Sequence, residues 1–282
     1  MDKNKAFSLF NQMITEASDE LLDFTLNTPI NPEHKADKSV VTQCDKQIEN
    51  RLVKIAQDSD LQVVPEEGDK VLEIVKSGNY LTIDPIDGTL GYLEYVNNAI
   101  DKGDIKNFLK EDLGAASDFC LLLGLVENGK PTFGACFNFI TKEKILIDGS
   151  NPDNLIRENN VRGYSQEYAV YVDRRQGDFI EQELVSLPDV SVIKQAALGL
   201  KSLYTVIDPH KSAVTVHRVQ TAGLWDIMPA AVACRAFGGK VYDDKGEELK
   251  FQDYIVLPGV GATIIKGDRF NFVLDLLKKP RQ

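Results

Sequence analysis

Two apolar runs joined through an asparagine-glycine pair constrain the fold of this chain more than any other feature. Residues 119–126 and 131–139 are mostly apolar, and Asn128 and Gly129 lie between them. Asn-Gly favours the tight turns whose twist matches that of two paired strands. We therefore predict an antiparallel hairpin over these residues.

Helical and strand-like segments lie on both sides of this hairpin. A stripe of Phe7, Phe10, Ile14, Ala17 and Leu21 recurs at steps of three and four residues, which predicts an amphipathic helix. We predict further helices over residues 42–58, 179–187, 198–207, 225–237 and 270–277, and strands over 61–64, 80–83 and 169–172. In the helix over 225–237, Pro229 is expected in the first turn and Gly238 and Gly239 at the end.

Length and charge limit the classes of function. A chain of 282 residues fits one compact unit, with a possible seam in the polar stretch 150–166 that separates halves 1–160 and 161–282. The net charge of −11 repels nucleic acid polymers, so we expect none as partners. Apolar runs are too short to span a membrane, and the first residues lack an apolar signal core. We therefore expect a cytoplasmic protein, monomeric or homodimeric, with its four cysteines reduced.

Acidic residues form clusters at the expected ends of helices and strands. The clusters contain Asp45, Glu66 with Glu67, Asp84 with Asp87, and Asp226. Carboxylates that converge in a protein interior repel one another unless a cation neutralises them. Oxygen ligands without histidine or thiolate suit hard cations, so the expected cofactor is Mg²⁺, with Mn²⁺ as an alternative.

The central cluster has the sequence Asp84-Pro85-Ile86-Asp87-Gly88-Thr89. Pro85 favours an extended Asp84 and is expected to end the strand there, directing both aspartates to one point. Gly88 permits close approach of a ligand, and a helix that begins at Thr89 offers free N–H groups to a phosphate. Cation ligands beside anion donors are what metal-assisted phosphoryl transfer requires.

Each acidic residue also has a purely structural interpretation. Asp45 follows Thr42 by three residues and fits a capping box. Residues 66–69 fit a solvated turn, Asp87 with Gly88 fits an ordinary turn, and Asp226 fits the first turn of a helix. The metal site is favoured because the structural interpretation requires four separate coincidences.

At these residues the chain resembles the inositol monophosphatase superfamily of magnesium-dependent, lithium-sensitive phosphatases. The resemblance spans residues 35–245 and implies a layered α/β sandwich of alternating α-β-α-β-α layers, as in fructose bisphosphatase. It rests on three motifs in the same order, Val41-Thr42-Gln43-Cys44-Asp45 with Glu66-Glu67, Asp84 to Thr89, and Trp225-Asp226 running to Gly238-Gly239.

The resemblance also implies a set of metal ligands. Glu66, Asp84 and the Ile86 carbonyl would bind one metal ion, and Asp84, Asp87 and Asp226 a second, with a third ion near Glu66 left open. No covalent intermediate is expected.

Two further roles follow from the resemblance. Asp45 and Thr89 would serve catalysis by orienting the attacking water, and Glu66 would serve it by holding the further ion. The Gly88 and Thr89 amides would hold the phosphate of a small phosphorylated metabolite.

Within the superfamily, details favour a 3′(2′),5′-bisphosphate nucleotidase over an inositol monophosphatase. Arg218 lies where nucleotidases tend to carry an arginine, and its planar fork suits a second phosphate. Val219 replaces an acid that is usual in inositol phosphatases. Lys201 and His217 are possible substrate contacts, although a surface lysine and a hydrogen-bonded strand histidine are the alternatives.

Three questions stay open. The stretch 94–114 fits either a solvated helix or a lid beside the site. Phosphatases that form an aspartyl-phosphate also use Asp and Thr after a strand, but their aspartates are one residue closer together than Asp84 and Asp87. A non-catalytic metal-binding regulatory protein is the remaining alternative.

Overall fold

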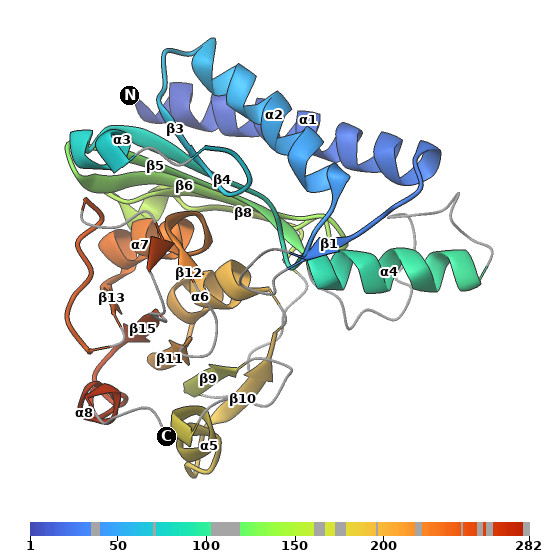
Figure 1. The fold of residues 1–282 in the computed structure, drawn as a ribbon. Helices are drawn as coiled ribbons and strands as arrows, with labels where there is room; N and C mark the ends of the chain where they lie inside the picture. The colour runs from blue at the N-terminus through green and yellow to red at the C-terminus, as the bar shows by residue number, and fades with distance from the viewer. Residues whose placement is uncertain are drawn as a thin grey trace.

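The chain folds into five alternating layers of helices and sheets (Figure 1). The fold is that of a computed structural model, which describes residues 1–34, 40–69, 72–102, 119–160, 167–172, 179–195, 197–217, 222–243, 245–252, 256–257 and 262–278. This arrangement confirms the predicted α/β layered sandwich. No helix within these residues is long and apolar enough to cross a membrane.

Two amphipathic helices, α1 (Lys3–Asn27) and α2 (Gln43–Gln57), form the first layer. Asp2 caps α1 by accepting a hydrogen bond from the Lys5 N–H. Thr42 and Asp45 form the predicted capping box at the start of α2. Both helices therefore agree with the periodicity of the sequence, and α1 is longer at each end than its apolar stripe.

The second layer is a sheet for which the structure describes six strands. The predicted hairpin is confirmed as its centre, and its two strands pair antiparallel. The first two strands of the sheet are parallel to each other, and the remaining pairs are antiparallel. In spatial order the strands are β3 (Val63–Pro65), β4 (Tyr80–Asp87), β5 (Cys120–Glu127), β6 (Lys130–Asn138), β7 (Lys144–Asp148) and β8 (Ile156–Glu158).

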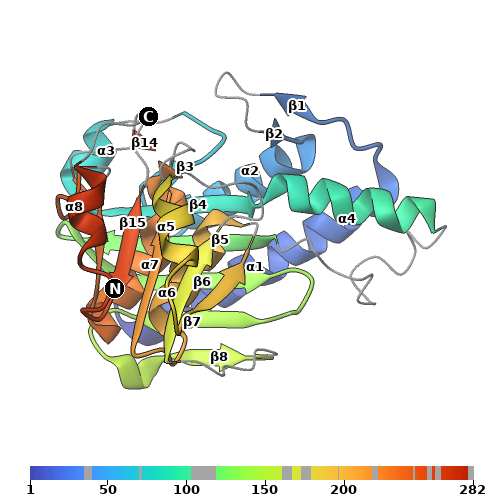
Figure 2. The same ribbon diagram turned by 90° about the horizontal axis from the view of Figure 1, so that it is seen from below.

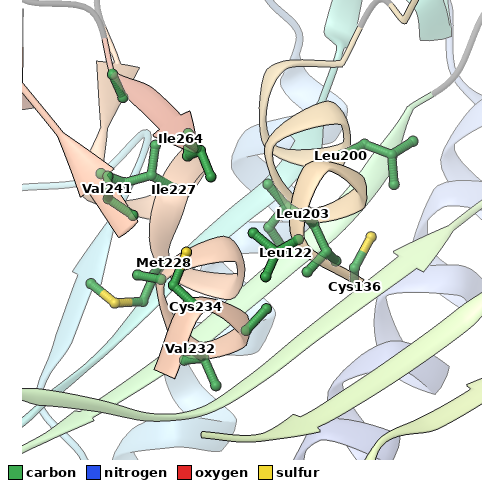
Figure 3. Packing of buried hydrophobic residues seen from close by; sticks show 14 of the residues in the cluster. Leu122, Cys136, Leu200, Leu203, Ile227, Met228, Val232, Cys234, Val241 and Ile264 are labelled. Carbon is green, nitrogen blue, oxygen red and sulfur yellow. The ribbon is translucent and has the colours of Figure 1, made fainter. Parts of the chain in front are cut away.

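Strand β5 is apolar from Cys120 to Val126 because helices cover both faces of the sheet. Leu121 and Leu123 pack in the cluster beneath α1 and α2, whereas Leu122 packs in the cluster on the opposite face. Alternating side chains thus enter two different cores. Figure 3 shows the second core, in which Leu122 lies near Leu203 and Met228.

The third layer consists of α6 (Leu198–Ile207) and α7 (Leu224–Phe237), which lie between the two sheets (Figure 1). Gly238 ends α7 in the left-handed conformation, as predicted. The expectation that Pro229 lies in the first turn is wrong, because α7 begins at Leu224 and places Pro229 in its second turn. Proline has no N–H there to donate to the Trp225 carbonyl.

The fourth and fifth layers come from the last part of the chain. The five-stranded sheet has the order β10 (Ser191–Lys194), β9 (Tyr168–Val172), β11 (Ser212–Val216), β15 (Thr263–Lys266) and β13 (Gly239–Tyr242). Helices α5 (Phe179–Val185) and α8 (Val273–Leu277) cover its outer face with a third apolar cluster. Phe270 belongs to this cluster but lies in the turn before α8, so the predicted helix over 270–277 is shorter than expected.

The remaining elements connect these layers. Helix α4 (Thr89–Asp101) extends away from the rest of the protein (Figures 1 and 2). In the stretch 94–114, for which a helix or a lid was expected, residues 94–101 are therefore helical. Residues 103–114 lie outside the described residues. The division into halves 1–160 and 161–282 stays a prediction. The short elements are α3 (Leu72–Ser77), the 3-10 turn Pro152–Asn154, and two two-stranded ladders, β1 (Glu33–His34) with β2 (Val40–Val41) and β12 (Ala222–Gly223) with β14 (Val256–Leu257).

Candidate active site

A β-bulge in β4 directs Asp84 and Asp87 to the same face of the sheet. Asp84 lies opposite Leu122 and Asp87 opposite Cys120, so β4 holds one more residue than β5 over this interval. Residues three apart in a regular strand point to opposite faces, and the extra residue cancels that difference. The expectation that Pro85 ends the strand is wrong, because β4 continues to Asp87.

The side chains around the bulge show the change of face directly. Leu81 and Ile83 pack in the cluster beneath α1 and α2, as alternation requires. Ile86 packs in the same cluster, although an even-numbered residue of a regular strand would point the other way. Pro85 suits this position because a bulge removes the need for one backbone donor.

Asp226 joins the two aspartates of β4 from the first turn of α7. One carboxylate oxygen each from Asp84, Asp87 and Asp226 lies within 4.8 Å of the others. Asp226 also accepts a hydrogen bond from the Gly223 N–H at 2.5 Å, which fixes it against the start of the helix. The structure thus brings together residues that are 139 to 142 positions apart in sequence.

The electrostatics of this cluster favour a bound cation. Burial, together with the charges of the neighbouring carboxylates, raises the pKa of Asp84 well above its usual value. The Asp84 Oδ1 atom is buried and has no hydrogen-bond donor among the residues that the structure describes. An unsatisfied buried oxygen among carboxylates, without imidazole or thiolate in the cluster, fits a hard divalent ion.

Asp87 is held by the N-terminus of α6. Its carboxylate accepts backbone hydrogen bonds from Leu198 (3.0 Å), Gly199 (2.8 Å) and Leu200 (3.0 Å). Ala197 supplies no side-chain cap, so Asp87 satisfies amides that would otherwise lack acceptors. Burial nevertheless raises the pKa of Asp87 to about 6, because desolvation outweighs these hydrogen bonds.

Gly199 makes this contact between α6 and β4 possible. A Cβ atom at position 199 would lie 2.1 Å from Leu122 Cδ1, 2.5 Å from the Asp226 carbonyl oxygen and 3.1 Å from Asp87 Oδ2. Only a residue without a side chain allows the first turn of α6 to approach both the Asp87 carboxylate and the backbone of Asp226.

Asp45 connects α2 with the start of α4. Its Oδ2 accepts hydrogen bonds from the Thr42 N–H (2.8 Å) and hydroxyl (2.5 Å), and its Oδ1 lies 3.0 Å from the Thr89 hydroxyl. The capping interpretation of Asp45 is therefore correct, but it accounts for only one of the two carboxylate oxygens. Burial raises the pKa of Asp45 to about 6, and the charge of Glu66 adds to this effect.

Glu66 lies at the end of β3, beside the cluster. Its N–H donates to the Ile83 carbonyl at 3.1 Å, and its charge contributes to the raised pKa of Asp84, Asp87 and Asp45. The side chain is half-buried, whereas Asp69 is exposed. The interpretation of residues 66–69 as a solvated turn is therefore correct for the backbone, but the Glu66 side chain is not fully solvated.

The expected phosphate-binding amides lie at the N-terminus of α4. Gly88 occupies the N-cap with a φ of 93°, in the left-handed region that favours glycine, and Thr89 is the first helical residue. The Thr89 hydroxyl also lies 3.1 Å from the Ile86 carbonyl. First-turn amides have no acceptor within their own helix, which leaves them available to an anion.

The expected substrate contacts have different outcomes. The surface interpretation of Lys201 is wrong, because its side chain on α6 is fully buried. His217 is buried directly after β11. Its ring Nε2 lies 3.3 Å from the Ser202 hydroxyl, and its backbone N–H donates to the Ala262 carbonyl. Arg218 and Val219 lie outside the described residues.

Two contributors to the site were missed at the level of sequence. Glu49 is buried on α2, where its carboxylate accepts a hydrogen bond from the Glu67 N–H. Its position one helical turn after Asp45 was a signal available in the sequence. The amides of Leu198 and Gly199 had no such signal, because they meet Asp87 only through the tertiary fold.

Comparison with known proteins agrees with this geometry. The sequence profile of the inositol monophosphatase family matches residues 5–263. A 3′,5′-bisphosphate nucleotidase of Arabidopsis thaliana is 28% identical over 157 residues, which are 54% of this chain and 36% of that protein. The chain therefore matches little more than a third of the length of this relative.

Solved structures have the same fold. A staphylococcal inositol monophosphatase in an inhibitory lithium chloride complex superimposes with a TM-score of 0.70 at 16% identity, over 98% of this chain and 96% of that one. An IMPase/NADP phosphatase complexed with Mg²⁺ and phosphate gives 0.69 at 16% identity, over 97% and 95%. At such identities the likeness shows the layered fold.

Proposed function

Because the chain belongs to the inositol monophosphatase family, we propose that it is a phosphoric monoester hydrolase, namely an Mg²⁺-dependent phosphatase of small metabolites. In this proposal water attacks the phosphorus atom directly, without a covalent enzyme intermediate. Two or three Mg²⁺ ions are involved, and Mn²⁺ is a possible substitute.

One observation carries this proposal. Asp84, Asp87 and Asp226 converge within 4.8 Å, and a buried oxygen of Asp84 has no donor within the described part of the chain. Such an arrangement is unfavourable in a protein without a cation. The full proposed ligand set is Glu66, Asp84, the Ile86 carbonyl, Asp87 and Asp226.

Bound Mg²⁺ would supply positive charge that lowers the pKa of a water and offsets the charge of the phosphoryl group. The protein's own contribution is to orient that water. When the Thr89 hydroxyl donates to Asp45, its oxygen can accept a hydrogen bond from the attacking water. Asp45 is itself held by Thr42, so this pair has a fixed direction.

The N-terminus of α4 supplies the complementary part of the site. The Gly88 and Thr89 amides are proposed to hold the non-bridging phosphate oxygens and so place the phosphorus atom beside the carboxylates. Because the helix starts two residues after Asp87, its first amides lie next to a proposed cation ligand along the chain.

For the substrate we propose a 3′(2′),5′-bisphosphate nucleotide, with inositol 1-phosphate as the second candidate. The nucleotidase from Arabidopsis thaliana supports the first, together with Arg218 as a proposed contact to a second phosphate. The staphylococcal inositol monophosphatase keeps the second candidate in consideration.

Parallel kinetics test the proposal. Hydrolysis of 3′-phosphoadenosine 5′-phosphate, inositol 1-phosphate and fructose 1,6-bisphosphate would be followed by phosphate release, with Mg²⁺ and after its removal by EDTA. We expect Mg²⁺-dependent release, inhibition by millimolar lithium and the highest kcat/KM for the first substrate. Absence of hydrolysis across a broad panel of phosphate esters would instead support a non-catalytic metal-binding protein.

A trapping experiment distinguishes direct water attack from an aspartyl-phosphate mechanism. Borohydride added during turnover would label Asp84 or Asp87 only if one of them carried a phosphoryl group. We expect no label, because both carboxylates are proposed to be engaged as ligands.

A further inference from the structure

We propose that Glu49 is a positioning residue, whose carboxylate holds the loop that carries Glu66 and so sets the affinity of the site for its divalent cation. This inference rests on the proposed Mg²⁺-dependent activity. Glu49 has no direct contact with substrate in this role, and it acts through the backbone of residue 67.

The first observation is a buried hydrogen bond between α2 and the loop. Glu49 is 3% exposed, and its Oε2 accepts the Glu67 N–H at 2.7 Å. A hydrogen bond to a carboxylate is shorter and stronger than one between neutral groups. Glu49 lies one helical turn after Asp45, so the same face of α2 fixes two parts of the acidic site.

The second observation is the close approach of the loop backbone at Gly68. A Cβ atom at this position would lie 3.2 Å from Glu49 Oε1 and 3.0 Å from Pro65 Cγ. The loop thus passes close to the carboxylate, and a side chain at position 68 would require Glu49 and Pro65 to shift. The contact is specific to this path of the backbone.

The third observation is a groove that α2, β3 and the same loop border. It has a volume of about 560 Å³, and Glu49, Pro65, Gly68 and Asp69 are among the residues that line it. Side chains therefore do not pack tightly against the loop from this direction. A loop with little packing depends more on its hydrogen bonds to keep one conformation.

These contacts fix Glu66 on both sides. Its own N–H donates to the Ile83 carbonyl, which continues the pairing of β3 with β4. The next N–H along the chain, that of Glu67, donates to Glu49. With two successive amides held, the direction of the Glu66 side chain is set before a cation binds, and partners of this kind tune metal sites strongly.

Three variants test the inference, namely Glu49→Ala, Glu49→Gln and the control Asn50→Ala. Asn50 is the next residue of α2 and is exposed. Hydrogen exchange of the Glu67 amide in EDTA reports the position of the loop without metal or substrate. The half-saturating Mg²⁺ concentration, kcat at saturating Mg²⁺ and the Mg²⁺-induced shift in Tm report the effect on the site.

We expect Glu49→Ala to accelerate exchange of the Glu67 amide at least about 10-fold. We expect it to raise the half-saturating Mg²⁺ concentration about 10–100-fold, with kcat at saturating Mg²⁺ within about 3-fold of wild type. Glu49→Gln keeps an acceptor oxygen and is expected to show a shift of about 3–10-fold. Asn50→Ala should match wild type in every measurement.

An unchanged Mg²⁺ requirement in both Glu49 variants would overturn the inference, as would a fall in kcat at saturating Mg²⁺ without a change in that requirement. If Glu49→Ala does not fold, the isosteric Glu49→Gln variant carries the test. A wild-type enzyme that needs no Mg²⁺ would instead overturn the proposed function, and this result is obtained before any variant is made.

Discussion

Replacing Asp84 by asparagine should stabilise the metal-free protein while it abolishes catalysis. At an effective dielectric constant of about 20, two unit charges 4.8 Å apart repel by about 3.5 kcal/mol. The raised pKa of Asp84 means that the wild-type protein already avoids part of this repulsion by protonation. We therefore expect a gain of about 1–3 kcal/mol in the free energy of unfolding, or roughly 2–5 °C in Tm.

The gain should depend on pH with a definite sign. Folding raises the pKa of the Asp84 carboxyl above its value in the unfolded chain, near 3.8. Such a group stabilises the folded state at a pH below its unfolded pKa, and this stabilisation is lost as the pH rises through its folded pKa. Asparagine does not titrate. The advantage of Asp84→Asn should therefore be small at pH 4 and grow toward pH 8.

Asp148→Asn is the matched control. Asp148 is a buried carboxylate outside the site that accepts hydrogen bonds from Ser150 and Asn154, and these lower its pKa despite its burial. Replacing it should destabilise the protein by about 1–2 kcal/mol, because one acceptor is lost. The two isosteric changes thus have opposite signs.

Urea unfolding in EDTA and in excess Mg²⁺ would measure both variants. Wild type should gain stability from Mg²⁺ and Asp84→Asn should gain much less, since a proposed ligand is lost. If Asp84→Asn were less stable than wild type in EDTA, or gained as much from Mg²⁺, the electrostatic account of the site would be wrong.

Three further changes test separate parts of the site. Asp87→Asn should lower kcat at least about 10²-fold, measured by phosphate release, because it removes charge that acts in the transition state; near-normal turnover would contradict its role. Gly199→Ala should destabilise the protein by about 1–3 kcal/mol in urea unfolding and lower kcat, because the contacts with Leu122 and the Asp226 carbonyl outweigh the helix propensity of alanine; a more stable, active variant would refute this. Thr89→Val should lose about 10²-fold in kcat while Thr89→Ser retains most of it, since only the hydroxyl reaches Asp45, and equal losses would argue against water orientation.

Local patterns predicted those parts of the fold that depend on neighbouring residues. The limits of α2 followed from Thr42 and Asp45, and the central hairpin followed from Asn128 and Gly129, because capping and turn formation act within a few residues. The five-layer arrangement came from the resemblance of the acidic motifs to a known family. No periodicity in the sequence would have predicted it.

The features that escaped prediction depend on contacts distant in sequence. The bulge in β4 is defined by pairing with β5, so Pro85 alone suggested the end of a strand instead. The partners of Asp87 are amides more than a hundred residues away. A surface position was the alternative interpretation of Lys201 because a lysine rarely lies in an interior, and only its place on a helix between two sheets reveals the burial.

The aspartate at position 87 and the bulge in β4 depend on each other. With regular alternation, an aspartate at this position would face the apolar cluster beneath α1, where an unpaired charge is strongly disfavoured. With the bulge but an apolar residue there, the first amides of α6 would lose their acceptor. Either change alone harms the protein, so a homologue that has abandoned the chemistry should have altered both together.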